Sequence, residues 1–198
     1  MLKRLFDIIF SLLGLIIFFP VLVSIALLIK NEDKGPVFHR GVRIGKNGVS
    51  FKIYKFRTMV INADKIGGPS TSDDDPRLTK IGKLIREYKL DELPQLINVL
   101  KGEMSFVGPR PEVSQEVELY SEEHRRVILS VQPGMTDYSS IKFHNEGEIL
   151  KGSKNPHQTF REKIQPEKIR LGLRYAQEHS FWIDLKIIFQ TLKTVTRG

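Results

Sequence analysis

The chain has 198 residues, a length that suits one domain of ordinary size plus a short additional segment. It contains no cysteine, which excludes a disulfide framework and a thiolate zinc site. Residues 1–60 carry +7 of the formal net charge of +8, and these basic residues surround an apolar segment. This distribution favours anionic lipid headgroups over nucleic acid as a partner.

The first predicted element is a long apolar helix. Residues 8–29 are uncharged over 22 positions, and about 20 apolar residues suffice to cross a bilayer. No small-residue cleavage site follows, so a signal peptide is not expected. Pro20 lies mid-run, where it removes a backbone hydrogen bond and kinks a helix. Basic residues flank both ends, so both ends are compatible with the cytoplasmic face, and an ordinary kinked spanning helix is the alternative.

Short strands are predicted next, at 37–38, 42–44 and 49–57, where side chains alternate between turns. On the last strand Lys55 and Arg57 share a face, which meets either an anionic ligand or solvent. Residues 62–80 are polar and predict a mobile surface loop, with the three aspartates at 73–75 solvated or capping rather than binding calcium.

A short amphipathic helix follows at 81–85, and it carries Arg86 toward the next motif. Apolar residues recur with helical spacing from Leu93 to Leu100, and Pro94 suits a first turn, so a helix is predicted from about 92 to 101. Asp91 and Glu92 then lie at its positive end. That position keeps them ionised and attracts phosphate oxygens, although simple capping is the alternative interpretation.

Residues 104–107 predict a short apolar strand that runs into a Gly-Pro-Arg-Pro turn. Pro109 and Pro111 flank Arg110 and stiffen the loop that presents its guanidinium, a group suited to bidentate phosphate binding. The alternative is a plain turn. Pro111 is also predicted to begin a scaffold helix that reaches about Val127.

The C-terminal part of the chain predicts further helices after a turn at 133–136. Residues 181–195 form a broad apolar face, which either lies in a membrane interface or packs against the domain core. The five histidines are far apart in the sequence and predict no zinc site.

Taken together, residues 91–95 (Asp-Glu-Leu-Pro-Gln) and 108–111 (Gly-Pro-Arg-Pro) resemble the hallmark of the bacterial sugar transferases, the small monotopic phosphoglycosyl transferases of surface-polysaccharide assembly. The resemblance extends to 51–59, 101–107, 133–136 and 184–186, and so covers nearly the whole chain. It implies a mixed α/β, mainly helical fold. Residues 1–34 would form a re-entrant membrane helix-break-helix with the break at Pro20, and residues 35–198 a cytosolic catalytic domain on the bacterial inner membrane, with short strands and amphipathic interfacial helices.

Successive residues on a helix diverge by about 100°, so Asp91 and Glu92 need unequal roles, one as nucleophile and the other as a proton or positioning group. The resemblance assigns Asp91 as the nucleophile on the β-phosphate of a UDP-sugar. UMP would leave, and a polyprenol phosphate would take the phosphosugar from the aspartyl intermediate. Mg²⁺ held at Asp91 would screen the pyrophosphate, while Lys55, Arg86 and Arg110 would neutralise the transferring charge.

The chain departs from the family pattern at two places. Phe19 stands where a serine usually precedes the membrane proline. The segment 137–145 replaces a Gly-Trp-Ala-Gln-Val-Asn-Gly-Arg-like run, so His144 falls where the family has arginine and is expected to grip the nucleotide or sugar differently. The resemblance also allows a homodimer.

Two other readings of the sequence remain open. One is a membrane-anchored, metal-dependent phosphodiesterase, which would hydrolyse its substrate without a lipid acceptor. The other is a non-enzymatic scaffold that binds anionic lipids, in which the acidic residues merely cap a helix.

Overall fold

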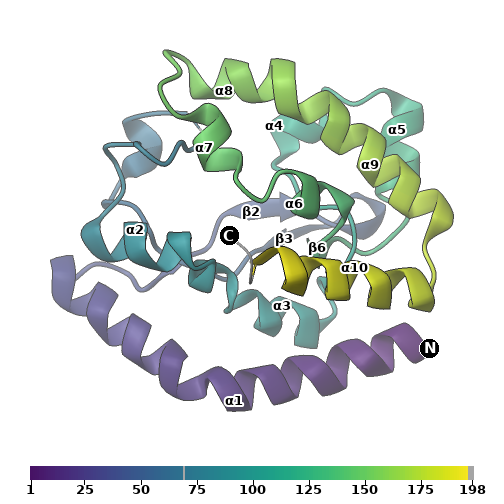
Figure 1. Ribbon diagram of the computed structural model, residues 1–198, viewed down its shortest axis with the longest axis horizontal. Helices are drawn as coiled ribbons and strands as arrows, with labels where there is room; N and C mark the ends of the chain where they lie inside the picture. The colour runs from purple at the N-terminus through teal and green to yellow at the C-terminus, as the bar shows by residue number, and fades with distance from the viewer. Residues whose placement is uncertain (69, 196–198) are drawn as a thin grey trace.

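The computed structural model describes residues 1–68 and 70–195, and it confirms a mixed α/β, mainly helical fold (Figure 1). The α-helices are α1 (Leu2–Asp33), α2 (Lys80–Glu87), α3 (Gln95–Lys101), α4 (Ser114–Val117), α5 (Glu122–Ile128), α6 (Tyr138–Lys142), α7 (Glu146–Leu150), α8 (Pro156–Thr159), α9 (Gln165–Glu178) and α10 (Phe181–Val195). Single turns of 3₁₀-helix lie at η1 (Lys46–Gly48), η2 (Ala63–Lys65) and η3 (Leu90–Glu92), and a π-helical turn, η4 (Phe160–Ile164), leads into α9. The strands are β1 (Phe38–His39), β2 (Val42–Ile44), β3 (Ser50–Lys52), β4 (Lys55–Phe56), β5 (Ser105–Val107) and β6 (Gly134–Thr136).

Helix α1 runs along one side of the molecule and bends partway along its length (Figure 1). Pro20 lies inside it, yet the helix is continuous over 32 residues. The carbonyl of Pro20 accepts a hydrogen bond from Ser24 Oγ at 2.8 Å, one turn further on. The predicted helix-break-helix is therefore replaced in the structure by one bent helix, and passage into a single leaflet stays a prediction.

Both ends of α1 are tied to the rest of the molecule. Near its start, Lys3 Nζ lies 2.6 Å from Asp184 and donates to the carbonyl of Val107 at 2.9 Å. At its other end, Asp33 forms an ion pair with Arg57 at 2.5 Å. Arg57, predicted to share an exposed face with Lys55, is instead buried in this contact.

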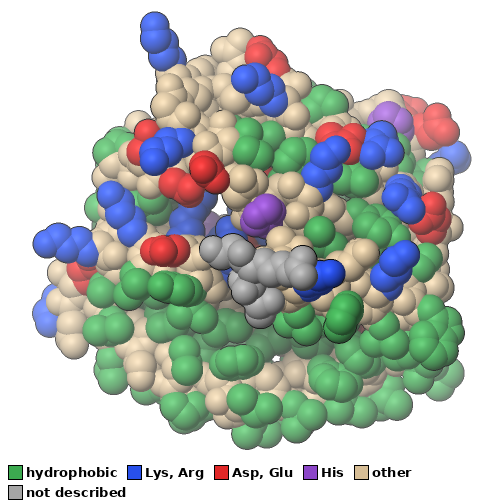
Figure 2. Space-filling model, viewed as in Figure 1, with side chains coloured by type: hydrophobic (Ala, Val, Ile, Leu, Met, Phe, Trp, Pro, Cys, Tyr) green, Lys and Arg blue, Asp and Glu red, His purple; other side chains and the backbone are tan. Residues whose placement is uncertain are grey.

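The outer surface of α1 is apolar. Within the described residues, α1 is long and apolar enough to cross a membrane. Figure 2 shows hydrophobic side chains gathered along the edge of the molecule that α1 forms in Figure 1. Helix α10 is divided: Ile187 is fully buried in the core, whereas Trp182 and Phe189 are 77% and 71% exposed. Packing against the core is thus confirmed for one face of α10, and the membrane interface stays a prediction for its exposed apolar face.

The strands form three separate pairs in the described residues. β1 pairs with β4 and β2 with β3, both antiparallel, and β5 pairs with β6 in parallel. The predicted strand 49–57 is split into β3 and β4, because Asn98 of α3 binds the backbone between them: it accepts from Tyr54 N at 2.8 Å and donates to the carbonyl of Lys52 at 3.0 Å.

The segment before α2 contains buried charged residues that the sequence did not predict. Asp75 and Arg77 form an ion pair at 2.7 Å and both are buried, so Asp75 is neither solvated nor a cap. Arg77 also donates to the carbonyl of Gly68 at 2.9 Å. Part of the predicted surface loop is therefore buried, and its mobility stays a prediction.

The scaffold helix predicted from Pro111 is two short helices, α4 and α5. The first ends at Val117, and Ser121 caps the second, because its hydroxyl accepts from His124 N at 3.2 Å. Beside them, β5 and β6 approach so closely that a side chain at Gly108 would collide with the carbonyl of Gln132, and one at Gly134 with Gly108 N. These two glycines let the Gly-Pro-Arg-Pro turn lie directly on the turn at 133–136.

Candidate functional site

The two adjacent carboxylates lie just before α3 rather than in its first turn. Asp91 and Glu92 belong to the 3₁₀ turn η3, and α3 begins at Gln95 with Pro94 at its cap position. Lys89 precedes the turn with φ of 55°, a left-handed conformation that redirects the chain. The helix ends at Lys101, as predicted, and Gly102 follows it with φ of 83°, a left-handed conformation that glycine adopts readily.

Lys55 of β4 bridges both carboxylates. Its Nζ lies 2.8 Å from Asp91 Oδ2 and 3.1 Å from Glu92 Oε1. Asp91 is 1% exposed, and its Oδ2 has an ion-pair partner but no hydrogen-bond donor among the described residues. A buried carboxylate oxygen in this state still has the capacity to bond to a ligand.

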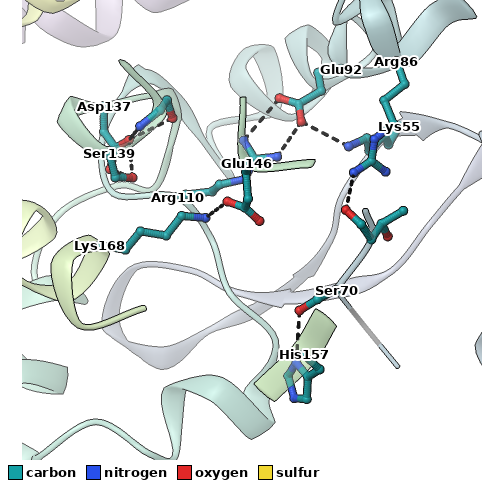
Figure 3. A network of polar contacts seen from close by, with 12 residues as sticks. Lys55, Ser70, Arg86, Glu92, Arg110, Asp137, Ser139, Glu146, His157 and Lys168 are labelled. Carbon is teal, nitrogen blue, oxygen red and sulfur yellow. Dashed lines mark hydrogen bonds and ion pairs between the residues drawn. The ribbon is translucent and has the colours of Figure 1, made fainter. Parts of the chain in front are cut away.

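Glu92 is fully engaged by cations. It accepts a bidentate pair of hydrogen bonds from Arg110 and a further one from Lys55 (Figure 3). Burial would raise the pKa of Glu92, but the charges of Arg110 and Lys55 outweigh it and hold that pKa well below its usual range. The charge of Glu92 in turn raises the pKa of Arg110. Of the two roles predicted for the second carboxylate, positioning therefore fits Glu92 better than proton transfer.

The Gly-Pro-Arg-Pro turn presents Arg110 to this cluster. The carbonyl of Pro109 accepts from Gly134 N at 3.1 Å, which fixes the turn to the start of β6. Pro109 and Pro111 themselves line a separate cavity of about 20 Å³ behind the turn. They shape the loop, and neither lines the larger cavity of about 230 Å³ that is described below. Their predicted part in binding would therefore be indirect.

Two larger cavities adjoin each other near the cluster. One of about 230 Å³ is lined by Lys55, Asp91, Glu92 and Arg110, and the structure thus brings these predicted residues together. The other, of about 490 Å³, is lined by both basic and acidic residues, among them Lys83, Arg86, Lys89, Asp73, Glu87 and Glu148. Five residues line both cavities: Asp73, Arg86, Lys89, His144 and Gly147.

Arg86 and His144 lie where the cavities meet rather than in the ion-pair cluster. Arg86 donates to the carbonyl of Thr71 at 3.0 Å (Figure 3), and His144 is exposed. Lys89, Asp73, Glu146 and Lys168 also line the 230 Å³ cavity and were not predicted. Lys89 had one local signal, its position two residues before Asp91. Asp73 comes from the segment before α2, and Glu146 and Lys168 come from α7 and α9, which are distant in sequence. Pro20 is on α1 and lines neither cavity.

Asp91 is the residue predicted to hold Mg²⁺. No group of three or more acidic, histidine or cysteine side chains in the described residues is arranged to hold a metal. Mg²⁺ is usually bound through one or two carboxylates together with substrate phosphates and waters, rather than by a protein cage. Asp91, with a buried oxygen that lacks a hydrogen bond, fits that mode, and the magnesium site stays a prediction.

The apolar helix is a candidate membrane anchor, and a cluster of carboxylates and cations lines an open cavity, features typical of a membrane-associated protein with a polar binding site. The chain belongs to the bacterial sugar transferase family, whose model matches residues 1–198.

Three curated relatives show the range of similarity. The chain is 40% identical over 196 residues to UDP-glucose:undecaprenyl-phosphate glucose-1-phosphate transferase of Escherichia coli K12, covering 97% of the chain and 39% of that protein. It is 35% identical over 201 residues to UDP-N-acetylgalactosamine-undecaprenyl-phosphate N-acetylgalactosaminephosphotransferase of Aeromonas hydrophila, covering 99% of the chain and 44% of that protein. It is 35% identical over 208 residues to the exopolysaccharide production protein ExoY of Sinorhizobium fredii, covering 98% of the chain and 84% of that protein. The chain therefore spans less than half the length of the first two.

Proposed function

We propose that this protein is a phosphoglycosyl transferase that moves a phosphosugar from a UDP-sugar to a membrane polyprenol phosphate. The products are UMP and a polyprenol diphosphate sugar, as in the first membrane step of surface glycan synthesis. The names of the relatives support the donor and acceptor classes. The observation that carries the proposal is the cluster of Asp91, Lys55, Glu92 and Arg110 at the wall of an open cavity.

In the first step, the carboxylate of Asp91 attacks the β-phosphorus of the UDP-sugar. A bond forms between Asp91 and phosphorus, the bond from that phosphorus to the bridging oxygen breaks, and UMP leaves with the electron pair. Lys55 and Arg110 lie where they neutralise charge on the phosphoryl oxygens, and Arg86 lies toward the cavity that suits the departing UMP.

In the second step, an oxygen of polyprenol phosphate attacks the phosphorus of the aspartyl phosphosugar and releases Asp91 as a free carboxylate. Glu92 takes no covalent part. Its ion pairs with Lys55 and Arg110 hold both cations against the cavity, so that they meet the phosphates already in position.

Asp91 would hold Mg²⁺ together with the substrate phosphates, which supplies additional positive charge against the pyrophosphate. The protein residues keep their own tasks whether or not the ion is bound. Lys55 must exchange its contact with Asp91 for one with phosphate as the donor enters, which frees the carboxylate for attack.

Helix α1 would determine how deep in the membrane the reaction takes place. A long isoprenoid does not leave lipid at low free-energy cost, so the site must lie near the headgroups. A re-entrant α1, with both ends on the cytosolic side, would set that depth, and its anchoring to the domain at Lys3 and Asp33 supports this arrangement. The proposed location is the cytosolic face of the bacterial inner membrane.

The test is release of UMP from UDP-sugars by the purified protein with Mg²⁺, with and without polyprenol phosphate. Sustained turnover that requires the lipid and yields polyprenol diphosphate sugar supports the proposal, and Asp91→Asn should reduce it to background. Sustained release of sugar phosphate without lipid would instead identify the phosphodiesterase. No turnover under any of these conditions, with lipid binding unchanged in Asp91→Asn, would identify the scaffold.

A further inference from the structure

The ion pair between Glu146 of α7 and Lys168 of α9 lines the 230 Å³ cavity together with Asp91 and Arg110. The two charged atoms are 2.5 Å apart. We infer that this pair is the element that recognises the hydroxyl groups of the donor sugar, an inference that rests on the proposed function. It assigns a selectivity role to residues that the phosphoryl chemistry does not use.

The first observation that supports the inference is the position of the pair in the network of polar contacts. Figure 3 shows Lys168, Glu146, Arg110, Glu92, Lys55 and Arg86 following one another across the site. The phosphates of a UDP-sugar belong with the cations at the middle of this row, Lys55 and Arg110. What the cavity offers on either side of them then decides where the nucleotide and the sugar lie.

The two sides differ in size and in the groups that they present. Toward Arg86 the row opens into the 490 Å³ cavity, whose wall carries Lys83, Arg86 and Lys89 beside three acidic residues, so this side offers both cations for the nucleotide phosphate and room for the nucleotide. Toward Lys168 the wall presents the carboxylate of Glu146, which repels a further phosphate but accepts hydrogen bonds from hydroxyl groups. The sugar is therefore expected on the side of Glu146.

The pair is held ready for a polar ligand. Lys168 has a side chain only 12% exposed, and its Nζ lies 5.0 Å from the centre of the Phe160 ring, so Glu146 and the ring fix it together. The side chain of Glu146 is 32% exposed. Lys168 contacts its Oε2, and in the described part of the chain Oε1 accepts no hydrogen bond. One oxygen is thus available to accept, and the ammonium group is available to donate.

The same helix carries a second ion pair that serves as a comparison. Glu167, the neighbour of Lys168, pairs with Lys142 of α6 at 2.6 Å. That pair also connects α9 to another helix, but the Lys142 side chain is 55% exposed and neither residue lines either of the two larger cavities. A pair that merely joins helices does not need to lie on the cavity wall.

Selectivity follows from the cost of leaving these groups unpaired. A site built to hydrogen-bond a substrate hydroxyl rejects an analogue that lacks it, or presents it elsewhere, far more strongly than an apolar pocket does. Replacing the carboxylate of Glu146 by an amide weakens the acceptor, adds a donor and removes the ion pair with Lys168. This change should reduce the differences between donors that differ at one ring position, while the nucleotide half of the donor binds as before.

The experiment measures kcat/KM for UMP release with UDP-glucose, UDP-galactose, UDP-N-acetylglucosamine and UDP-N-acetylgalactosamine, and inhibition by UDP alone. In Glu146→Gln and Lys168→Met, the ratio between the best and worst donor should fall at least about 10-fold, with the inhibition constant of UDP unchanged. Glu167→Gln should keep the ratios of the native protein. Because the measure is a ratio between donors, partial loss of folded protein does not affect it.

The outcomes distinguish failure of the inference about Glu146 and Lys168 from failure of the proposed function. If Glu146→Gln and Lys168→Met slow all four donors equally, or weaken UDP as much as the donors, the inference is overturned while the transferase function stands. If the native protein releases no UMP from any donor with acceptor present, the proposed function itself fails.

Discussion

Lys55 forms ion pairs with both carboxylates of the site. Its Nζ lies within 3.1 Å of oxygens of both Asp91 and Glu92. Without it, Asp91 would be a buried carboxylate with no counter-charge, and the arriving phosphates would lose one of the cations that neutralise them.

Lys55→Met should therefore lower kcat at least about 100-fold, a typical effect of removing one preorganised electrostatic contact. The matched control is Lys52→Met, since Lys52 lies nearby on β3 with an exposed side chain and lines neither cavity. UMP release under saturating donor and acceptor measures both. Equal kcat values for the two variants would contradict the role given to Lys55.

Glu92 and Glu112 should respond to pH in opposite senses. The folded pKa of Glu92 lies below its ordinary value of 4.5, so its stabilisation is present above pH 4.5 and is lost as the pH falls through the folded pKa. Burial raises the folded pKa of Glu112, so its ionised form costs stability at neutral pH, and that cost disappears as the pH falls through this raised value toward 4.5.

At pH 7.5, Glu92→Gln should lower the urea midpoint and Glu112→Gln should raise it. The Glu112 difference should shrink as the pH falls toward 4.5, and the Glu92 difference should shrink only below about pH 4.5. Urea unfolding followed at several pH values measures this directly. A stabilising Glu92→Gln at neutral pH, or a difference that grows on acidification, would show that the charge network is assigned wrongly.

The sequence predicted the charged members of the site better than their neighbours. Four of them were predictable because each lies in a motif that is visible in the sequence, and the structure brings them together: Asp91, Glu92, Lys55 and Arg110. Glu146 and Lys168 were missed because a single glutamate or lysine on a helix has no local signature, and the cavity that both residues line exists only in the folded chain.

At the scale of elements, helix ends were predictable where one residue decides them. Gly102 ends α3 with a positive φ, as expected. The start of α3 was placed too early, because Leu90–Glu92 closes a 3₁₀ turn with its own hydrogen bonds and Pro94 then serves as the cap. The division of α4 from α5 had a local signal in Ser121 followed by two glutamates, a typical helix start.

The docking of α2 depends on a glycine. A Cβ at Gly82 would collide with the carbonyl oxygen of Thr58, which also accepts a hydrogen bond from Thr79 N at 3.0 Å. Gly82→Ala should therefore destabilise the protein by about 1–3 kcal/mol, as overpacking does. The measurement is the free energy of unfolding in urea.

Gly172 in α9 is the control, because a Cβ there would lie 3.7 Å from Ile128 and Pro109 in ordinary contact. Gly172→Ala should be neutral or stabilise by up to about 1 kcal/mol through helix propensity. A neutral Gly82→Ala would mean that α2 and the segment at Thr58 are not in close contact in the native protein.

At the scale of the whole molecule, both ends of α1 contact one folded body, through Lys3–Asp184 and Asp33–Arg57. A helix that crossed the bilayer would place these ends on opposite sides and would have to break one of the contacts. The apolar run predicted membrane association, but contacts this distant in sequence could not be predicted from periodicity.

The natural absence of cysteine allows a direct test of topology. Single cysteines at Leu2→Cys and Asn31→Cys, both exposed positions near the ends of α1, should react with a membrane-impermeant thiol reagent from the same side of sealed vesicles. Gln115→Cys on α4 marks the side of the domain. Labelling of positions 2 and 31 from opposite sides would show that α1 spans the bilayer.

The central claim is that the carboxylate of Asp91 becomes bonded to phosphorus. Intact-mass measurement of the protein incubated with a UDP-sugar and Mg²⁺, without lipid, tests it most directly. The account predicts a mass increase equal to one phosphosugar, located on Asp91 by peptide mapping, absent in Asp91→Asn and discharged by polyprenol phosphate. An unmodified protein that releases UMP only when donor and acceptor are both present would contradict it.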